Sequence, residues 1–173
     1  MEGNAMNTVD LFRKLAGFNA WANGKIYDSC AALPQDALRE NRGAFFGSIH
    51  ATLNHLLVVD RGWISRIEGV ASGVKSLDQI LYEDMAELRR AREAEDARLI
   101  RLCDGLDQEG IDRIVSYKFM DGTPAKTALD VILITLFNHQ THHRGQVHAM
   151  LTQAGRPGLD LDILVYEFER EAA

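Results

Sequence analysis

Apolar residues recur at helical spacing in four long segments of the chain, and the first two segments have clear ends. The first predicted helix covers residues 9–32, and its apolar face consists of Leu11, Leu15, Phe18, Ala22 and Ile26. Pro34 follows it as a stop signal. The second predicted helix covers residues 48–69, with Ser48 as its N-cap and Gly69 as its terminator. Both segments therefore predict amphipathic helices with one face to bury.

The third and fourth helices are predicted from similar signals. The third opens with the capping-box pattern Ser-Leu-Asp-Gln at residues 76–79 and ends at Gly105. Its mixed charges at residues 89–98 are typical of a solvated helix face. Thr127 is expected to cap the fourth helix, and the Gly-Arg-Pro stretch at residues 155–157 is expected to end it. Four helices of this length predict a bundle.

Residues 111–126 break the helical period and predict a small β-hairpin. Residues 114–119 suit a strand, the Asp-Gly pair at residues 121–122 suits a tight turn, and Pro124 limits the returning strand to an edge. The tail, residues 159–168, is expected to form one more short turn of helix. The predicted fold class is all-α: a four-helix bundle of antiparallel type, in which the hairpin before the last long helix makes one connection long.

Composition narrows the class of protein. With 173 residues, 46% hydrophobic and 25% charged, the chain has enough apolar material for one domain over residues 1–173, with residues 1–6 as a disordered leader. The net charge of −6 argues against nucleic-acid binding, which depends on clustered Lys and Arg. The longest apolar run, residues 131–137, is too short to cross a membrane, and the start lacks the regions of a signal peptide. Cys30 and Cys103 are expected to be separate, small buried hydrophobes in a cytoplasmic protein.

Four of the six histidines fall in residues 136–151, on the fourth predicted helix. His139 and His143 continue the apolar line of this helix. That line consists of Leu129, Ile132, Leu136, Val147 and Met150. The two histidines lie roughly 40° apart around the helix axis, one above the other, which is the geometry with which two imidazoles share one metal ion. His142, roughly 60° to the other side of His139, is a flanking polar group or an alternative ligand, and His148, roughly 180° away, is expected at the surface.

A third histidine is predicted to face the same interior. His55 on the second helix lies among leucines, whereas His50, in the first turn, is nearer the rim. A lone inward histidine is usually a hydrogen-bonded core residue, but three together need a shared partner. His55, His139 and His143 would supply three neutral nitrogens to one metal ion and leave at least one coordination position open.

Other chemistries fit the sequence less well. Residues 139–143 have the HExxH frame of metalloproteases, but Gln140 stands where that chemistry needs a carboxylate base. No glutamate precedes these histidines by three positions, as di-iron bundles require, so one ion is expected rather than two. The sequence has no glycine-rich phosphate-binding motif, and neither cysteine lies in the signature of a Cys-His nucleophile.

Three stretches together resemble a known family. They are NAWANGKIYDSCAALP at residues 19–34, GSIHATLNHLLVVDRGW at residues 47–63 and NHQTHHRGQVHAML at residues 138–151. These stretches are similar to the DinB-like four-helix metalloproteins, and the resemblance covers nearly the whole chain. Its most specific part is the HxxxHRGQ pattern of the last stretch. The resemblance implies a bundle of unusual connectivity that is often dimeric, so a homodimer is one expectation for this chain.

The resemblance also implies a mononuclear divalent metal ion held by three histidines. The family's first ligand precedes an Asp and a Trp, which maps to His55 before Asp60 and Trp63. The other two ligands map to His139 and His143. Two further histidines do not fall on the family's ligand positions, namely His50 and His142. The ion is expected to be Zn²⁺ or Ni²⁺ by the preference of imidazole, with Fe, Mn and Co as alternatives.

Relatives of known activity act on low-molecular-weight thiols, as thiol S-transferases or thiol-dependent isomerases. The resulting hypothesis is a metal-dependent enzyme that activates a small thiol toward an electrophilic second substrate. Asp60, Asn138 and Gln146 are candidates to fix the imidazole tautomers. Trp21 and Trp63 are expected in the core rather than in a substrate pocket.

Two alternative functions remain open at this point. One is a non-catalytic bundle in which the metal staples two helices together or senses the supply of an ion. A fourth protein ligand such as His142 would favour this alternative. The other is metal-hydroxide hydrolysis, which needs no thiol.

Overall fold

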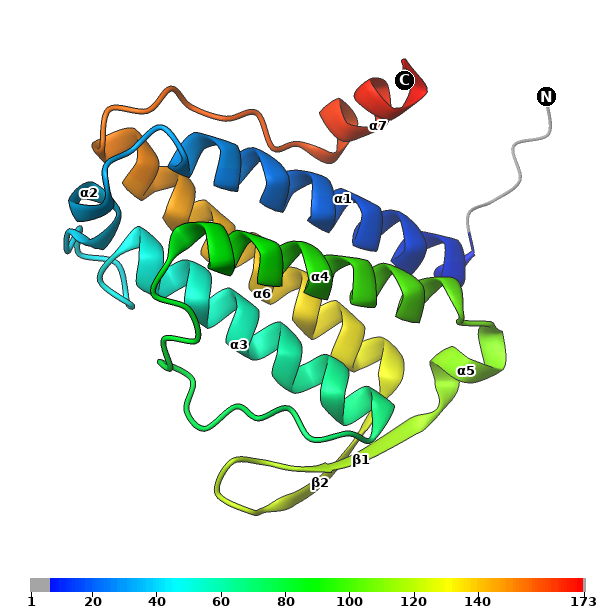
Figure 1. Ribbon diagram of the computed structural model, residues 1–173. Coiled ribbons are helices and arrows are strands. Elements are labelled where there is room, and N and C mark those ends of the chain that lie inside the picture. The colour runs from blue at the N-terminus through cyan, green and yellow to red at the C-terminus, as the bar shows by residue number, and fades with distance from the viewer. Residues whose placement is uncertain (1–6, 173) are drawn as a thin grey trace.

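Four long helices and a small hairpin make up the fold (Figure 1), which confirms the predicted class. The computed structural model describes residues 7–172, so the predicted leader at residues 1–6 lies outside the described residues. The long helices are α1 (Thr8–Cys30), α3 (Ile49–Glu68), α4 (Met85–Asp104) and α6 (Leu129–Gln153). The shorter elements are α2 (Gln35–Arg39), α5 (Gln108–Asp112), β1 (Ile114–Lys118), β2 (Pro124–Ala128) and α7 (Ile163–Glu171).

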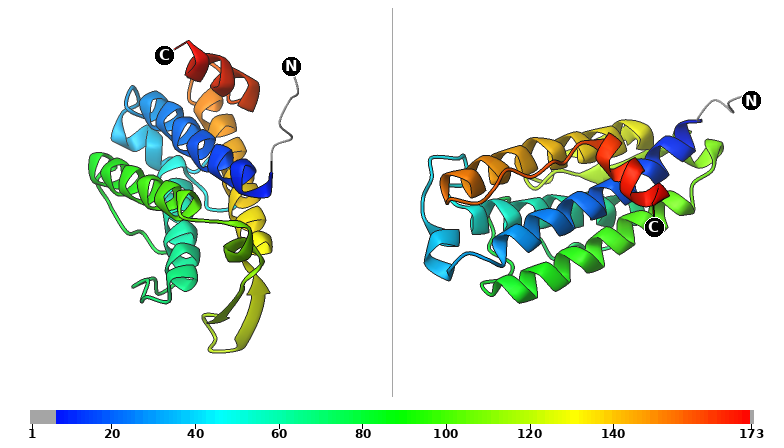
Figure 2. Two further views of the ribbon diagram at one scale, coloured as in Figure 1. Left: turned by 90° about the vertical axis from the view of Figure 1, so that its right-hand side faces the viewer. Right: turned by 90° about the horizontal axis from the view of Figure 1, so that it is seen from above.

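The directions of the long helices require one connection as long as the bundle. Helices α1 and α6 run one way along the bundle, and α3 and α4 run the other way (Figures 1 and 2). Because α3 and α4 are parallel, the chain has to return along the bundle between them, and it does so in residues 70–84, called the crossover loop below. The long connection predicted from the sequence is the one that contains the hairpin, between α4 and α6. The segment that runs the length of the bundle is instead the crossover loop, between α3 and α4.

Local signals place most helix ends, with one clear exception. The Ser48 hydroxyl accepts a hydrogen bond from the first turn of α3 at 3.1 Å, and Gly69 ends that helix at a φ of +73°. The predicted start of α4 is wrong, because the capping-box pattern at residues 76–79 lies in the crossover loop. Asp84 caps α4 instead and accepts from its first turn at 2.9 Å. The chain has to complete its return before the helix can begin.

The hairpin forms as predicted, but it leads into α6 without a side-chain cap. Strands β1 and β2 pair antiparallel, with Ile114 opposite Ala128. Thr127, predicted to cap the last long helix, is a strand residue whose hydroxyl lies 3.1 Å from the Tyr117 hydroxyl. Helix α6 begins directly after the strand, and no side chain caps it.

Two apolar clusters fill the two ends of the bundle, and a polar layer separates them. The cluster at the end where α1 begins includes Phe12, Ile64, Leu99 and Leu133. The cluster at the other end includes Ile26, Leu53, Leu88 and Met150. Between the clusters every long helix contributes buried polar or charged side chains, which we call the polar layer: Asn19, Asn23, Asp60, Arg92, Asp96, Gln140 and Arg144. The middle of the bundle is therefore a polar environment enclosed by apolar ones.

Further expectations concern single residues and the membrane. Cys30 and Cys103 are free thiols buried in the apolar clusters, as predicted. Trp63 packs against one apolar cluster, while Trp21 is half-buried against α7, with its ring centre 5.8 Å from that of Tyr166. Within residues 7–172, no helix is long and apolar enough to cross a membrane.

Candidate metal centre

Three histidines from two neighbouring helices meet near the middle of the bundle; we call them the triad. His55 comes from α3, and His139 and His143 come from successive turns of α6. One nitrogen of each ring lies within 4.8 Å of the other two, and Nε2 of His55 is 3.0 Å from Nε2 of His139. Two nitrogens that each bind one Zn²⁺ at about 2.0–2.1 Å are roughly 3 Å or slightly more apart. The structure thus brings the three predicted side chains to a spacing at which they could hold one ion.

Hydrogen bonds fix the tautomers of two of the three rings. The carbonyl oxygen of Leu77, in the crossover loop, lies 2.7 Å from Nδ1 of His55 and can only accept, so His55 carries its proton on Nδ1. The side-chain oxygen of Gln146 accepts in the same way from Nδ1 of His143 at 2.8 Å. Nε2 of both rings therefore carries the lone pair, which is the form in which imidazole binds a metal, and Nε2 of His55 faces Nε2 of His139. Gln146, one of the predicted orienting residues, therefore does contact the triad.

The third ring, His139, lies in surroundings that disfavour its charged, doubly protonated form. Its Nδ1 is buried and has no hydrogen-bond partner among the described residues. Burial, followed by the neighbouring His143, His55 and His142, lowers the pKa of His139 from 6.5 to about 3. Burial also lowers the pKa of His55 and the pKa of His143. Three neutral imidazoles in close contact, one with an unpartnered nitrogen, fit a site with affinity for a cation.

Comparison with known proteins agrees with the resemblance found in the sequence. The DinB family model matches residues 5–172 of the chain. The chain belongs to the DinB family. It is 30% identical over 167 residues to Protein DinB of Bacillus subtilis (strain 168), an alignment that covers 92% of this chain and 95% of that protein. The crystal structure of a DinB-like protein from Bacillus cereus ATCC 10987 matches with a TM-score of 0.65 at 18% identity, over 83% of this chain and 90% of that one, and so has the same fold.

In this DinB-family chain a buried network of the polar layer lies beside the triad. Gln140, which follows His139, donates a hydrogen bond to Asp60 on α3. Asp60 also pairs with Arg92 on α4 at 2.7 Å, and Arg92 pairs with Asp96 at 3.0 Å. Burial raises the pKa of Asp60 to about 6, against the opposing effect of Arg92. Three helices are thus joined through one buried carboxylate and its guanidinium partner.

The α1 side of the polar layer completes this network. Asn19 and Asn23 donate to Asp96 at 3.1 and 3.0 Å, and Arg144 donates to the side-chain oxygen of Asn19. The two residues that follow the triad histidines of α6 are therefore both anchored in the polar layer. This anchoring fixes the rotation of α6 and, with it, the direction in which its two triad histidines point.

The polar layer also changes how several sequence features are understood. Asp60, a candidate to orient an imidazole, bonds within the polar layer instead. Asn138, another candidate, is exposed and forms no side-chain hydrogen bond to the triad in the described structure. The charged stretch at residues 89–98 is not simply a solvated face, because three of its side chains are buried: Arg92, Glu95 and Asp96. Buried charges need partners, and here these partners come from other helices, which local spacing does not reveal.

Two residues of α3 hold the crossover loop in place, a role that the sequence reasoning did not assign. The side-chain oxygen of Asn54 accepts from the backbone N–H groups of Leu81 and Tyr82 at 2.9 and 3.0 Å. His50, predicted near the rim, is only 3% exposed, and its Nε2 lies 3.0 Å from the carbonyl oxygen of Tyr82. These contacts secure the loop that carries the Leu77 carbonyl to the triad. Two polar side chains one turn apart in an apolar helix were the signal that could have revealed this role.

An aromatic ring that sequence reasoning also missed covers one side of the triad. The ring of Phe46 stacks on His55 with centroids 3.8 Å apart and planes at 23°, and its centroid is 5.6 Å from that of His143. Phe46 lies in the irregular segment between α2 and α3, where hydrophobic periodicity carries no information. Only the folded chain shows its position.

The remaining histidines of α6 lie outside the triad. His142 is exposed, and its Nε2 lies 3.2 Å from the side-chain nitrogen of Gln146, so this structure does not place it as an alternative ligand. His148, expected at the surface, is half-buried and accepts a hydrogen bond from the backbone N–H of Leu159 at 2.8 Å. It ties the segment after α6 back to that helix.

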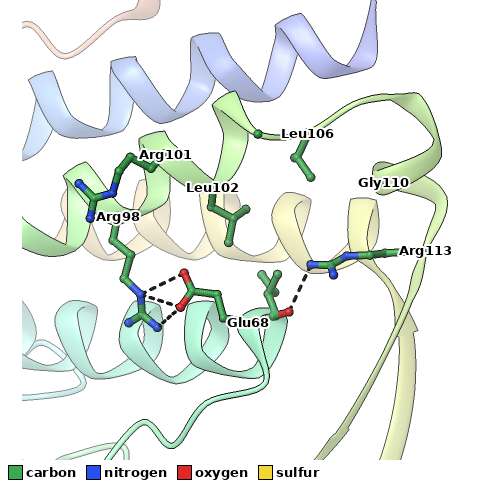
Figure 3. A pocket seen from close by; sticks show the side chains of 9 residues that line it. Glu68, Arg98, Arg101, Leu102, Leu106, Gly110 and Arg113 are labelled. Atoms are coloured by element: carbon green, nitrogen blue, oxygen red, sulfur yellow. Dashed lines mark hydrogen bonds and ion pairs between the residues drawn. The ribbon is translucent and has the colours of Figure 1, made fainter.

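A cavity of about 620 Å³ lies away from the triad, at the ends of α3 and α4 (Figure 3). Three arginines line it, and two of them have partners at these helix ends. Arg98 pairs with Glu68 at 2.6 Å, and Arg113 donates to the carbonyl oxygen of Ile67 at 3.2 Å. Cations at helix C-termini stabilise the unpaired carbonyl groups there. Two of the three arginines of this cavity are therefore explained by contacts at the helix ends, and no triad residue lines it.

Proposed function

We propose that this DinB-family protein is a metal-dependent enzyme that activates a low-molecular-weight thiol for transfer to an electrophilic second substrate. The observation that carries the proposal is the triad, because ring nitrogens of His55, His139 and His143 lie within 4.8 Å of one another. Two of these rings also have Nδ1 engaged, which leaves Nε2 free for an ion. Zn²⁺ and Ni²⁺ suit three imidazoles best, and Fe, Mn and Co also accept them.

The incomplete set of donors supports catalysis over a purely structural role. Structural zinc sites are usually closed by four protein ligands, whereas catalytic sites keep three and leave a position for water or substrate. Within residues 7–172, no fourth His, Cys, Asp or Glu joins the triad. His142, which could have closed the site, is exposed and bonds to Gln146 instead. An enzyme is therefore better supported than a metal-stapled or metal-sensing bundle.

The reactive thiol has to come from outside the chain. Cys30 and Cys103 are buried in the apolar clusters, and burial raises the pKa of each to about 12. Neither thiol is ionised or accessible near pH 7. A small thiol that diffuses to the triad is therefore the substrate that the proposal requires. Free cysteines and a thiol substrate also fit the expected cytoplasmic location, which remains part of the proposal.

The residues around the triad have separate tasks in this proposal. A divalent ion held by three imidazoles supplies Lewis-acid chemistry, which lowers the pKa of a thiol toward neutrality. His55 and His143 would hold the ion through Nε2, while the Leu77 carbonyl and Gln146 accept the Nδ1 protons and so keep both rings from turning. Phe46 shields one face of His55 from water. In the transfer, sulfur bonds to the electrophilic carbon, the leaving group departs with its electron pair, and the thiol proton passes to solvent.

The test compares two adjacent histidines. Metal content is measured by elemental analysis, and loss of a small thiol is followed in the presence of 1-chloro-2,4-dinitrobenzene. His143→Ala is expected to lose both the bound metal and the metal-dependent loss of thiol. His142→Ala, one residue away but outside the triad, is expected to keep both. Thiol loss that continues unchanged after exhaustive metal removal would refute the thiol reaction, and ester hydrolysis without any thiol would indicate a metal-dependent hydrolase instead.

A further inference from the structure

A tight turn with two phenylalanines lies at the triad. Residues 44–47, called the Phe turn below, have the sequence Ala-Phe-Phe-Gly. The backbone N–H of Gly47 donates to the carbonyl oxygen of Ala44 at 2.8 Å, and Gly47 has a φ of +78°, which favours glycine. The central positions of turns are usually occupied by Gly, Pro, Asn, Asp or Ser. Two adjacent phenylalanines at these positions are therefore not explained by the geometry of the turn.

The two rings of the Phe turn extend outward from the triad. Phe46 stacks on His55 with centroids 3.8 Å apart, and Phe45 packs edge-on against Phe46 at 4.9 Å. Phe45 is 84% exposed. Burial of apolar surface stabilises a protein, so an exposed ring forgoes that stabilisation until something covers it. The second ring thus offers unused apolar surface close to the triad.

The Phe turn lies on a solvent-facing side of the triad. Gln140 and Arg144, which follow the triad histidines of α6, are buried and bonded within the polar layer. The interior side of the triad is therefore filled with protein. The Phe turn lies on the side toward solvent, where Phe46 is half-buried and Phe45 is exposed. A ligand bound to an ion among the three rings would have Phe46 within reach, because the centroid of Phe46 is 3.8 Å from that of His55 and 5.6 Å from that of His143.

We infer that Phe45 and Phe46 form a subsite for an aromatic or flat apolar group of the molecule that occupies the open coordination position. Stacked and edge-to-face contacts between aromatic rings would hold that group. The inference rests on the proposed function to the extent that the triad must hold a metal ion. It adds the chemical class of the part of the substrate that does not react.

The experiment measures ligand binding rather than turnover. Co²⁺-loaded protein, whose visible bands respond to a change of ligand, is titrated with phenylmethanethiol and 2-mercaptoethanol, and separately with benzoate and acetate. Phe45→Ala, a change at an exposed position that should not disturb folding, is expected to weaken the aromatic member of each pair about fivefold. The small member of each pair is expected to bind as before. Phe168→Ala, at a position 68% exposed on α7, is the matched control and should leave all four affinities unchanged.

The outcomes separate this inference from the proposed function. If Phe45→Ala weakens the binding of both ligands of a pair equally, or of neither, the subsite is overturned. Binding of a thiol by the wild type would still support the proposed function in that case. If benzoate binds but no thiol does, the thiol reaction is contradicted and the carboxylate pair alone decides the subsite. A wild-type protein that binds no Co²⁺ refutes both.

Discussion

Gln140 donates a hydrogen bond to Asp60, and this contact joins the helix that carries two triad histidines to the helix that carries the third. Gln140 directly follows His139, so the bond fixes the rotation of α6 relative to α3 at the level of the triad. Arg92 reaches the same carboxylate at 2.7 Å from α4. The geometry of the candidate metal centre therefore depends on a buried charge pair that does not itself touch the centre.

Removal of Asp60 is expected to be strongly destabilising. Asp60→Leu would leave the buried guanidinium of Arg92 without this partner, a loss of about 3–5 kcal/mol in the free energy of unfolding. The control is Asp28→Leu, because Asp28 pairs with Arg89 at 2.8 Å in an exposed position, where less than about 1 kcal/mol is expected. Urea denaturation of both variants provides the measurement. Equal losses at the two positions would contradict the role given to the polar layer.

The metal-free protein is expected to lose stability as the pH falls below neutrality. Burial holds the pKa of His139 at about 3 in the folded chain, compared with 6.5 for a free histidine. Between these values the unfolded chain binds the proton and the folded chain does not, so the free energy of unfolding decreases as the pH falls from 6.5 toward 3. His55 and His143 act in the same direction, since burial lowers the pKa of each.

The measurement for this pH effect is urea unfolding of metal-free protein at about pH 7.5 and about pH 5, for the wild type and His139→Leu. The variant is expected to show the smaller difference in stability between the two conditions. An equal difference in both proteins would mean that His139 titrates normally in the folded chain.

Loss of the Gln146 side-chain oxygen is expected to weaken metal binding without unfolding the protein. The side-chain oxygen of Gln146 lies 2.8 Å from Nδ1 of His143 and accepts its proton. Removal of such an orienting group typically costs about 10–100-fold in metal affinity. Competition with a chromogenic chelator measures the affinity of Gln146→Leu. Gln146→Glu keeps an acceptor at this position and should recover most of the loss. If both variants bind metal as the wild type does, His143 is oriented by other contacts.

Asn54 is expected to control the order of the crossover loop. Asn54→Ala removes the acceptor for the backbone N–H groups of Leu81 and Tyr82, at a cost of about 1 kcal/mol for partly buried donors left without a partner. Hydrogen exchange should show faster exchange of these two amides, while the amides in the middle of α6 stay protected. The same variant should also bind metal more weakly, because the Leu77 carbonyl belongs to this loop.

Most bounds of the long helices and the pairing of His139 with His143 could be predicted because they rest on local spacing, whereas the assignment of His55 rests on its apolar neighbours and the family resemblance. His139 and His143 share a face of one helix by their separation alone, and Ser48 and Gly69 are local cap signals. These features need no knowledge of the neighbouring helices, so the residues that form them are visible in the sequence.

The features that could not be predicted depend on contacts between distant segments. The start of α4 at Met85 follows from the return of the chain along the bundle, not from the cap pattern at residues 76–79. The burial of Arg92 requires Asp60 from another helix. The position of Phe46 over His55 is set by an irregular segment with no periodic signal.

The crossover loop divides into a part that is held and a part that is free to change length. Residues 71–76 form hydrogen bonds only within the loop in the described structure, at Ser72 and Gln79. Beyond them, the Leu77 carbonyl is bonded to His55, and Asn54 holds the chain that follows. Insertions at residues 71–76 would therefore leave intact the hydrogen bonds that hold the loop to α3, whereas a shift of one residue after Leu77 would change the carbonyl presented to the imidazole. Divergence in the length of this loop can thus reshape the surface around the candidate metal centre without changing how its first histidine is aligned.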